Sequence, residues 1–279
     1  MQYRRVIIHP SDGFFKEPER NTAPEKQNYR LHILLFTATL LTTTFIGATM
    51  EGGNPFVNVG DIAQGLPFSL TLLLFLGTHE FGHYFAARRW NVRVTLPYFI
   101  PAPFPPIGTF GAVIKMRSAI PSRKALIDVG AAGPLAGFVI AVAASIIGLH
   151  LSDITTTQSV NSEEFIMLGD SLAFKFMSYL VYGPLPENAD ISLHPVAFAG
   201  WLGLFVTALN LLPIGQLDGG HILFAISPHV HEMVRRIRIP LLLLLGFTFW
   251  SGWFIWAIIL LFIGQPHPYP RKMEPELDT

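Results

Sequence analysis

The feature that most constrains this chain is a long apolar run, PFSLTLLLFLGTHEFGHYFAA, from Pro67 to Ala87. A helix needs about 20 mainly apolar residues to cross a bilayer, and this run meets that length. It nevertheless contains His79, Glu80 and His83 near its end. Ionisable side chains inside a span are costly, and they normally face a protein interior or a water-filled cavity. The run therefore predicts a membrane helix that carries a functional site.

The composition agrees with a membrane protein. Of the 279 residues, 51% are hydrophobic and only 14% are charged, and the mean hydropathy is +0.43, whereas soluble domains are about 25% charged. The formal net charge is zero, so the sequence indicates no basic surface for nucleic acid. The chain has no cysteine, which excludes disulfides, thiolate metal ligands and cysteine nucleophiles.

Further apolar runs predict more membrane spans, because each is close to the length that a spanning helix needs. The predicted spans are Leu31–Met50, Leu66–Ala87, Ala125–Leu149, Val196–Leu212 and a last run, Pro240–Ile263. The letters SGW interrupt the last run, which is either one tilted span or two half-helices that turn back. The expected fold is an all-α polytopic membrane protein with about five or six transmembrane helices.

The stretch between the second and third spans is of another kind. It reads PYFIPAPFPPIGTFGAVIKM, which is apolar but broken by proline and does not fit a helix. The part GTFGAVIKM has strand-forming residues flanked by turn formers. We therefore expect a short membrane-associated β-hairpin or re-entrant loop here.

These elements divide the chain into three regions. Residues 1–30 form a polar, proline-rich and charged tail, which we expect to be cytoplasmic. Residues 31–263 form a multi-pass membrane domain whose core is residues 66–226. Residues 264–279 form a polar C-terminal tail.

The distribution of positive charge predicts the orientation. Lysine and arginine gather before the first span, between the second and third, and after the fourth, whereas the loops 51–65 and 150–195 hold only Lys175. Basic loops stay on the cytoplasmic side of a membrane. We therefore expect a multi-pass protein of the cell membrane with a cytoplasmic N-terminus.

His79, Glu80 and His83 fit the pattern HExxH. Residues four apart share one face of a helix, so both imidazoles can bind one metal ion, and Glu80 can take a proton from a metal-bound water. Zinc lowers the pKa of such a water to about 7. The competing interpretation is a pair of histidines satisfied by helix neighbours, and their position in an apolar run favours the metal site.

A catalytic zinc ion takes a third protein ligand, and Asp218 in NLLPIGQLDGG is the best candidate. Pro213 ends the preceding helix, and the glycines after Asp218 permit a turn back towards the metal. The charge pattern also predicts that Asp218 and His83 lie at the same depth, near the cytoplasmic side. The competing interpretation is an ordinary Asp-Gly-Gly turn at the membrane surface.

The third span contains GPLAG, in which Gly133 and Gly137 lie four residues apart. Small residues at this spacing let membrane helices approach closely. We therefore favour helix packing over active-site lining for these two glycines.

Together, HExxH in one span, GPLAG in the next and NLLPIGQLDGG near a later one resemble the site-2 protease family of intramembrane zinc metalloproteases. The resemblance covers about residues 66–226. The stretch GTFGAVI is similar to the PDZ-less branch of that family, which includes chloroplast relatives.

The resemblance implies one catalytic Zn²⁺ bound by His79, His83 and Asp218. It also implies that Glu80 is the catalytic base and that Asn210 positions or stabilises the scissile carbonyl. The implied activity is hydrolysis of peptide bonds in or near transmembrane helices of membrane proteins, that is, regulated intramembrane proteolysis. The implied partners are a membrane-protein substrate and the lipid bilayer.

A substrate helix in lipid hydrogen-bonds its own peptide groups, so it must unwind before cleavage and its freed backbone needs a partner. Edge pairing with the strand-like stretch can supply that partner. The predicted substrate-binding residues are Gly108, Thr109, Phe110 and Gly111. A plug at the membrane surface is an equally good interpretation of this stretch.

Two other classes of function compete with a protease. A catalytically silent scaffold that binds transmembrane helices would have no need of Glu80. A zinc transporter would need further acidic or histidine residues along several spans, and the first, third and last spans offer almost none.

Overall fold

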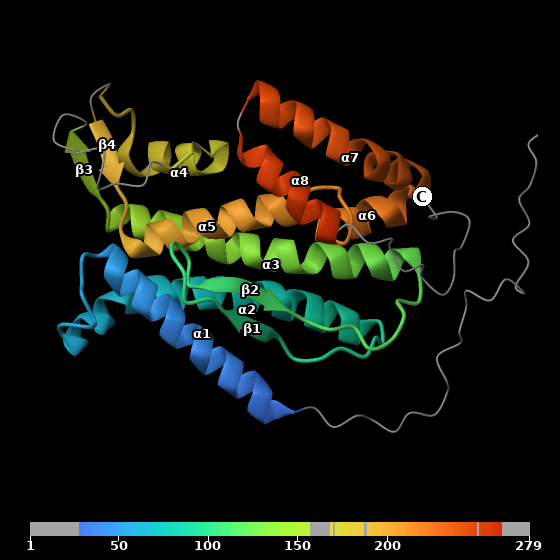
Figure 1. The fold of residues 1–279 in the computed structure, drawn as a ribbon, viewed down its shortest axis with the longest axis horizontal. Helices are drawn as coiled ribbons and strands as arrows, with labels where there is room; N and C mark the ends of the chain where they lie inside the picture. Colours follow the sequence, from blue (N-terminus) through green and yellow to red (C-terminus); the bar gives the residue numbers. More distant parts are fainter. Residues whose placement is uncertain (1–27, 157–167, 170, 187–188, 250, 264–279) are drawn as a thin grey trace, which may run out of the picture.

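The computed structural model describes residues 28–156, 168–169, 171–186, 189–249 and 251–263. Most of the predicted N-terminal tail and all of the predicted C-terminal tail lie outside these residues. The described chain is mostly helical (Figure 1). Its elements are α1 (Tyr29–Met50), the 3₁₀ helix η1 (Val59–Gly65), α2 (Leu66–Arg89), β1 (Tyr98–Pro101), β2 (Thr109–Val113), α3 (Arg123–His150), β3 (Asp153–Thr156), α4 (Leu172–Tyr182), β4 (Ala189–Ser192), α5 (Pro195–Asn210), α6 (Asp218–Ile226), α7 (Pro228–Thr248) and α8 (Gly252–Ile263).

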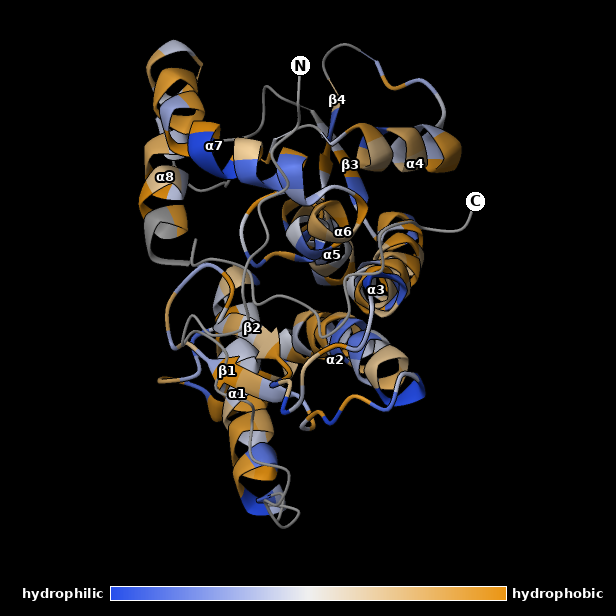
Figure 2. Cartoon of the chain, turned by 90° about the vertical axis from the view of Figure 1, so that its right-hand side faces the viewer, coloured by the Kyte–Doolittle hydropathy of each residue, from blue (hydrophilic) through white to orange (hydrophobic). Residues whose placement is uncertain are grey.

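Three helical stretches in the described part of the chain are long and apolar enough to cross a membrane. They are Tyr29–Met50, Val59–Arg89 and Arg123–His150, which coincide with the first three predicted spans. The fourth predicted span forms α5, which is apolar but shorter. Hydrophobic colouring covers most of these helices, with hydrophilic residues near some of their ends (Figure 2). The chain is thus a membrane protein with three candidate spans, and a count of five or six stays a prediction.

The last apolar run is two helices rather than one. α7 ends at Thr248 and α8 begins at Gly252. The two helices turn back on each other, with the rings of Phe247 and Phe254 5.0 Å apart. α7 also begins earlier than the apolar run, at Pro228, so that the arginines of RRIR lie within a helix.

Small residues allow α3 to pack tightly between α2 and α5 (Figure 1). A Cβ added to Gly148 of α3 would lie 2.1 Å from the backbone nitrogen of Ala197 in α5. A Cβ added to Gly200 of α5 would lie 2.5 Å from the backbone nitrogen of Ser145 in α3. Both distances are too short for a carbon atom, so the crossing of α3 and α5 depends on glycine.

A two-stranded ribbon lies against α1 and α2. β1 and β2 pair antiparallel, and a bridge between Val94 and Met116 extends the ribbon. His32 of α1 anchors it, because its Nδ1 donates to the carbonyl oxygen of Pro97 at 3.0 Å. Gly108, in the connection before β2, lies so close to α1 that an added Cβ would be 2.8 Å from the Cα of Thr43. The ribbon is therefore packed onto the helices, while its relation to a bilayer stays a prediction.

The close crossing of α3 and α5 predicts that Gly148→Ala destabilises the fold. Overpacking typically costs about 1–3 kcal/mol, so we expect the midpoint of thermal unfolding to fall by several degrees. Gly77→Ala is the matched control, because its added Cβ would meet nothing nearer than the ring of Phe99 at 3.7 Å. Both variants gain helix propensity. Equal midpoints for the two purified variants would show that the close approach does not limit stability.

Candidate metal centre

The HExxH motif lies in the second half of α2 and is buried. The exposed fractions of His79, Glu80 and His83 are 4%, 8% and 6%. The two histidines stand one turn apart on one side of the helix, as residues i and i+4 do. Their rings therefore come within reach of a third group from elsewhere in the fold.

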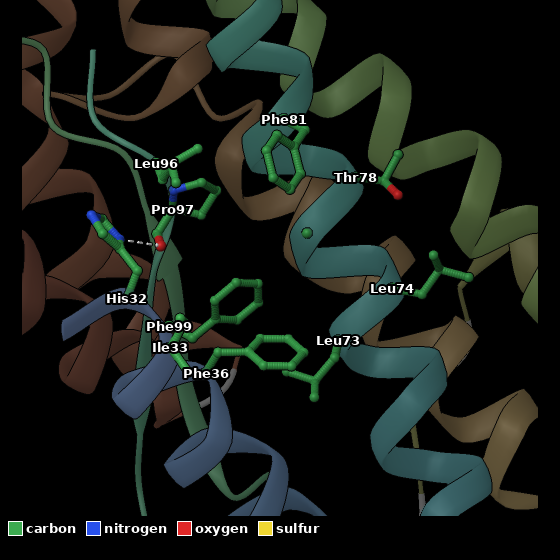
Figure 3. A pocket seen from close by; sticks show the side chains of 11 residues that line it. His32, Ile33, Phe36, Leu73, Leu74, Thr78, Phe81, Leu96, Pro97 and Phe99 are labelled. Atoms are coloured by element: carbon green, nitrogen blue, oxygen red, sulfur yellow. Dashed lines mark hydrogen bonds between the residues drawn. The ribbon is translucent and has the colours of Figure 1, made fainter. Parts of the chain in front are cut away.

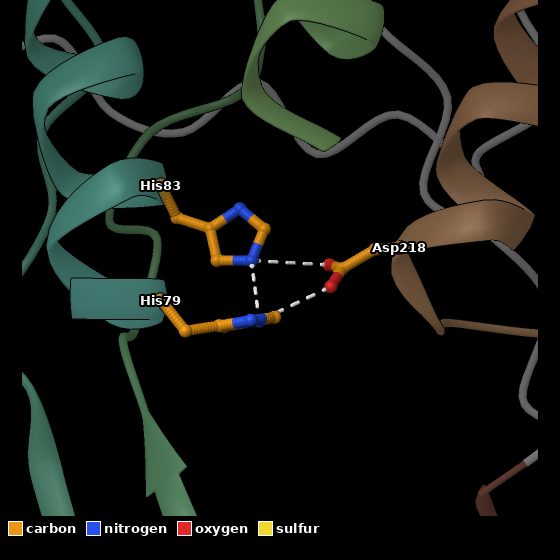
Figure 4. Close-up of side chains that lie close together, drawn as sticks. All are labelled: His79, His83 and Asp218. Atoms are coloured by element: carbon orange, nitrogen blue, oxygen red, sulfur yellow. Dashed lines mark hydrogen bonds and ion pairs between the residues drawn. The ribbon is translucent and has the colours of Figure 1, made fainter. Parts of the chain in front are cut away.

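Asp218 supplies that third group. α5 ends at Asn210, the chain turns through Gly215 with a φ of 58°, and Asp218 begins α6. Its carboxylate faces both imidazoles (Figure 4): the distance from Oδ2 to Nε2 of His79 is 3.3 Å, and that from Oδ1 to Nε2 of His83 is also 3.3 Å. Residues that are far apart in sequence thus converge on one point.

The backbone fixes the protonation of His83. Its Nδ1 lies 2.7 Å from the carbonyl oxygen of Val129 in α3. A carbonyl only accepts, so Nδ1 carries the hydrogen and Nε2 of the neutral ring is left with its lone pair. Such an outer hydrogen bond orients a ligating histidine. The free nitrogen of His83 points at Asp218 and lies 3.1 Å from Nε2 of His79.

These donors suit a bound cation. Lone pairs on two imidazoles and a carboxylate repel one another at such distances unless a proton or a metal ion lies between them. Ligand atoms of His79, His83 and Asp218 all lie within 4.8 Å of one another. Two nitrogens and an ionised carboxylate form a donor set that zinc uses.

Two glycines of α3 make room for the imidazoles. A Cβ added to Gly133 would lie 2.1 Å from Nε2 of His83, and one added to Gly137 would lie 3.2 Å from Nδ1 of His79. Gly82 completes the close approach from α2, because its added Cβ would be 2.5 Å from the carbonyl oxygen of Ala132. The preference for helix packing alone was therefore wrong: Gly133 and Gly137 pack the helices and also line the site.

Glu80 lies on the side of the site that faces the ribbon. The backbone N–H of Ile114, directly after β2, lies near its carboxylate, and His83 and Asp218 are its ionisable neighbours. No sequence signal pointed to Ile114 or Val129, because both act through backbone atoms whose position depends on tertiary packing. The spacing of the two glycines in GPLAG was the only sequence feature that drew attention to Gly133.

The structure does not bring every predicted residue to the metal ligands. Asn210 is half-buried at the end of α5, in the turn that leads to Asp218. Gly108 packs on α1 instead, and the side chain of Phe110 is 72% exposed. Thr109 holds the ribbon together, because its hydroxyl donates to the carbonyl of Ile100 at 2.7 Å.

Comparisons with known proteins agree with this geometry. The sequence model of the peptidase M50 family matches residues 67–248 of this chain. "Probable zinc metalloprotease EGY2, chloroplastic" of Arabidopsis thaliana is 32% identical over 89% of this chain and 44% of its own length. "Probable zinc metalloprotease EGY1, chloroplastic" of the same plant is 34% identical over 70% of this chain and 36% of its own. The protein named EGY2 in Oryza sativa subsp. indica is 32% identical over 79% of this chain and 41% of its own length. The chain thus spans less than half the length of these relatives.

The geometry predicts that zinc binding needs all three ligands. His83→Ala and Asp218→Asn should each leave purified protein with little zinc, because a catalytic site holds the ion through three protein ligands. His150→Ala is the control, since this histidine is exposed at the far end of α3. Elemental analysis of chelator-free preparations measures the effect. Full zinc content in either ligand variant would contradict this assignment.

A second prediction concerns a residue that binds no metal. In Gly133→Ala the new methyl group would occupy the place of the His83 ring and push it off the carbonyl of Val129. Disturbing such outer contacts weakens metal binding by about 10–100-fold. Zinc affinity can be measured by competition with a coloured chelator, with Gly77→Ala as the matched helix control. Unchanged affinity in Gly133→Ala would show that the ring has room to move.

Proposed function

The chain belongs to peptidase family M50, and from this premise we propose that it is a zinc metalloendopeptidase that cleaves membrane proteins in or near their transmembrane helices. One observation carries the proposal: His79 and His83 lie buried on an apolar helix long enough to span a membrane, and Asp218 of α6 completes a group that could hold a metal ion. A hydrolytic centre at that place meets substrates that are themselves in the bilayer.

We assign roles to the site residues from their geometry. His79, His83 and Asp218 would hold one Zn²⁺, and the bound ion would supply a Lewis acid that polarises a peptide carbonyl. Glu80 adjoins the ligands and would take the proton of the attacking water and deliver it to the leaving nitrogen. Asn210, in the turn before Asp218, would donate a hydrogen bond to the carbonyl oxygen as negative charge develops there.

The position of β2 supports a role in substrate binding. The backbone of Ile114, which follows β2, lies near the proposed base, so the ribbon passes beside the site. An unwound substrate segment laid along β2 would bring its peptide bonds to Glu80 while the strand satisfies its backbone. We propose that Thr109, Phe110 and Gly111 contribute through this strand, and Gly108 through the connection before it, rather than through contact with zinc.

A cavity on the other side of α2 suits an apolar segment. It has a volume of about 420 Å³ and lies between α1, α2 and the ribbon (Figure 3). Its walls are almost wholly apolar, and Gly77, Thr78 and Phe81 of α2 belong to them. These residues flank His79 and Glu80 in the sequence. The cavity thus offers a place for apolar side chains of a membrane-spanning substrate on the side of α2 opposite the metal ligands.

We also propose the orientation. The site lies towards the end of α2 that carries Arg88 and Arg89, and α3 begins at the same end with Arg123 and Lys124. Basic residues of this kind remain on the cytoplasmic side. The protein would thus be a multi-pass protein of the cell membrane with its N-terminus and its metal site towards the cytoplasm.

The proposal predicts that Glu80→Gln abolishes cleavage without loss of zinc. General bases contribute about 10²–10⁴-fold to a rate, so cleavage of a transmembrane model substrate in proteoliposomes should fall at least about 100-fold. Zinc content should stay at the wild-type value, because Glu80 is not one of the three ligands.

Chelator treatment and zinc repletion of the wild type provide the control for metal dependence. Cleavage by metal-free wild type and by Glu80→Gln at the rate of zinc-loaded wild type would sink the mechanism. Zinc in both proteins and cleavage by neither would support the alternative of a metal-holding scaffold.

A further inference from the structure

Helix α4 is apolar on two opposite faces. One face packs on the core between α3 and α5 through Phe174, Met177 and Val181. The opposite face carries an outer stripe of large side chains that are 60–89% exposed: Leu172, Phe176, Tyr179 and Leu180. These positions follow the spacing i, i+4, i+7 and i+8 of a single helix face. A helix that is apolar all round is normally covered all round, and the described protein covers only one side.

Three hydrogen bonds fix how α4 lies relative to the bundle. At its end, the hydroxyl of Tyr182 donates to the carbonyl oxygens of Leu149 and Ser152, where α3 finishes. Just before its start, the carbonyl of Gly169 accepts from Nε1 of Trp201 at 3.3 Å. Trp201 lies six residues into α5, which is roughly 9 Å along that helix. α4 therefore rises beside α5 from about this depth to the end of the bundle (Figure 1).

We propose that the outer stripe of α4 contacts lipid and that α4 is an interfacial helix in the leaflet opposite the basic loops. Interfacial helices bury an apolar face about 5–10 Å into the boundary between headgroups and acyl chains. The distance of roughly 9 Å along α5 from its start to Trp201 falls within this range. Trp201 and Tyr179 are also of the two residue types that gather at membrane interfaces.

Neighbouring surfaces continue the stripe. Trp201 stacks on Phe205 of α5 with ring centroids 5.5 Å apart, and Phe205 is 44% exposed. Lys175 is the only charged residue of α4, and it lies at the edge of the stripe, where a long side chain can extend to the headgroups. The chemistry thus matches lipid, with acyl chains against the stripe and phosphate near the lysine. The inference rests on the proposed membrane placement of the bundle.

The chain has no cysteine, so single cysteines can carry a nitroxide without background. The test uses Phe176→Cys and Leu180→Cys in vesicles of phosphatidylcholine and phosphatidylglycerol. Collision rates with oxygen, which dissolves in lipid, and with a water-soluble nickel chelate are measured by electron paramagnetic resonance. Val139→Cys, on an exposed part of α3, is the lipid control, and Glu51→Cys, at the end of α1, is the water control. Retained zinc content shows that each labelled variant is folded.

Oxygen collisions at positions 176 and 180 should exceed nickel collisions several-fold, as at position 139, with the order reversed at position 51. Water-like ratios at 176 and 180 with a lipid-like ratio at 139 would overturn the inference for α4 and leave the proposed function intact. A water-like ratio at 139 would instead overturn the membrane placement itself. Protection from both reagents at 176 and 180 would show that protein, not lipid, covers the stripe, which also overturns the inference.

Discussion

The rest of the structure depends on the meeting of His79, His83 and Asp218 inside an apolar bundle. A buried ionised carboxylate without a partner is strongly destabilising. Here it faces two imidazoles at 3.3 Å, and a cation between them would satisfy all three groups. The same contact joins α2 to α6, which are distant in sequence. The fold of the core and its chemistry are therefore a single problem, because neither the histidines nor the aspartate is stable there alone.

Glycine residues provide the space that the imidazole rings need between the helices. Imidazole rings fit between α2 and α3 only because Gly133 and Gly137 leave their volume empty. α3 in turn brings the carbonyl of Val129 to His83, which fixes the ring that faces Asp218. Small residues thus pack membrane helices and at the same time hold ligands in place, so a methyl group at position 133 acts on metal binding by displacing the His83 ring.

The ribbon connects this centre to its surroundings. Anchored on α1 through His32, it runs along α2 and reaches Glu80 with the backbone N–H of Ile114. An apolar cavity lies between the same elements, beside the HExxH turn. A peptide segment that enters from the bilayer would meet a strand, an apolar cavity and the proposed base within one region. The arrangement explains how a group of metal-binding side chains is compatible with an otherwise apolar fold.

The sequence by itself determined the long helices, the motif on α2 and the aspartate that completes it. These features depend on local hydrophobicity, on helical spacing and on charge at the ends of spans, all of which can be counted along the chain. Only the tertiary structure decided that Gly133 shapes the site, that Ile114 contacts Glu80, and that the last apolar run folds into two helices. These features depend on where backbone atoms of separate helices lie and on the space left between the helices. Both depend on how the helices cross rather than on which residues they contain.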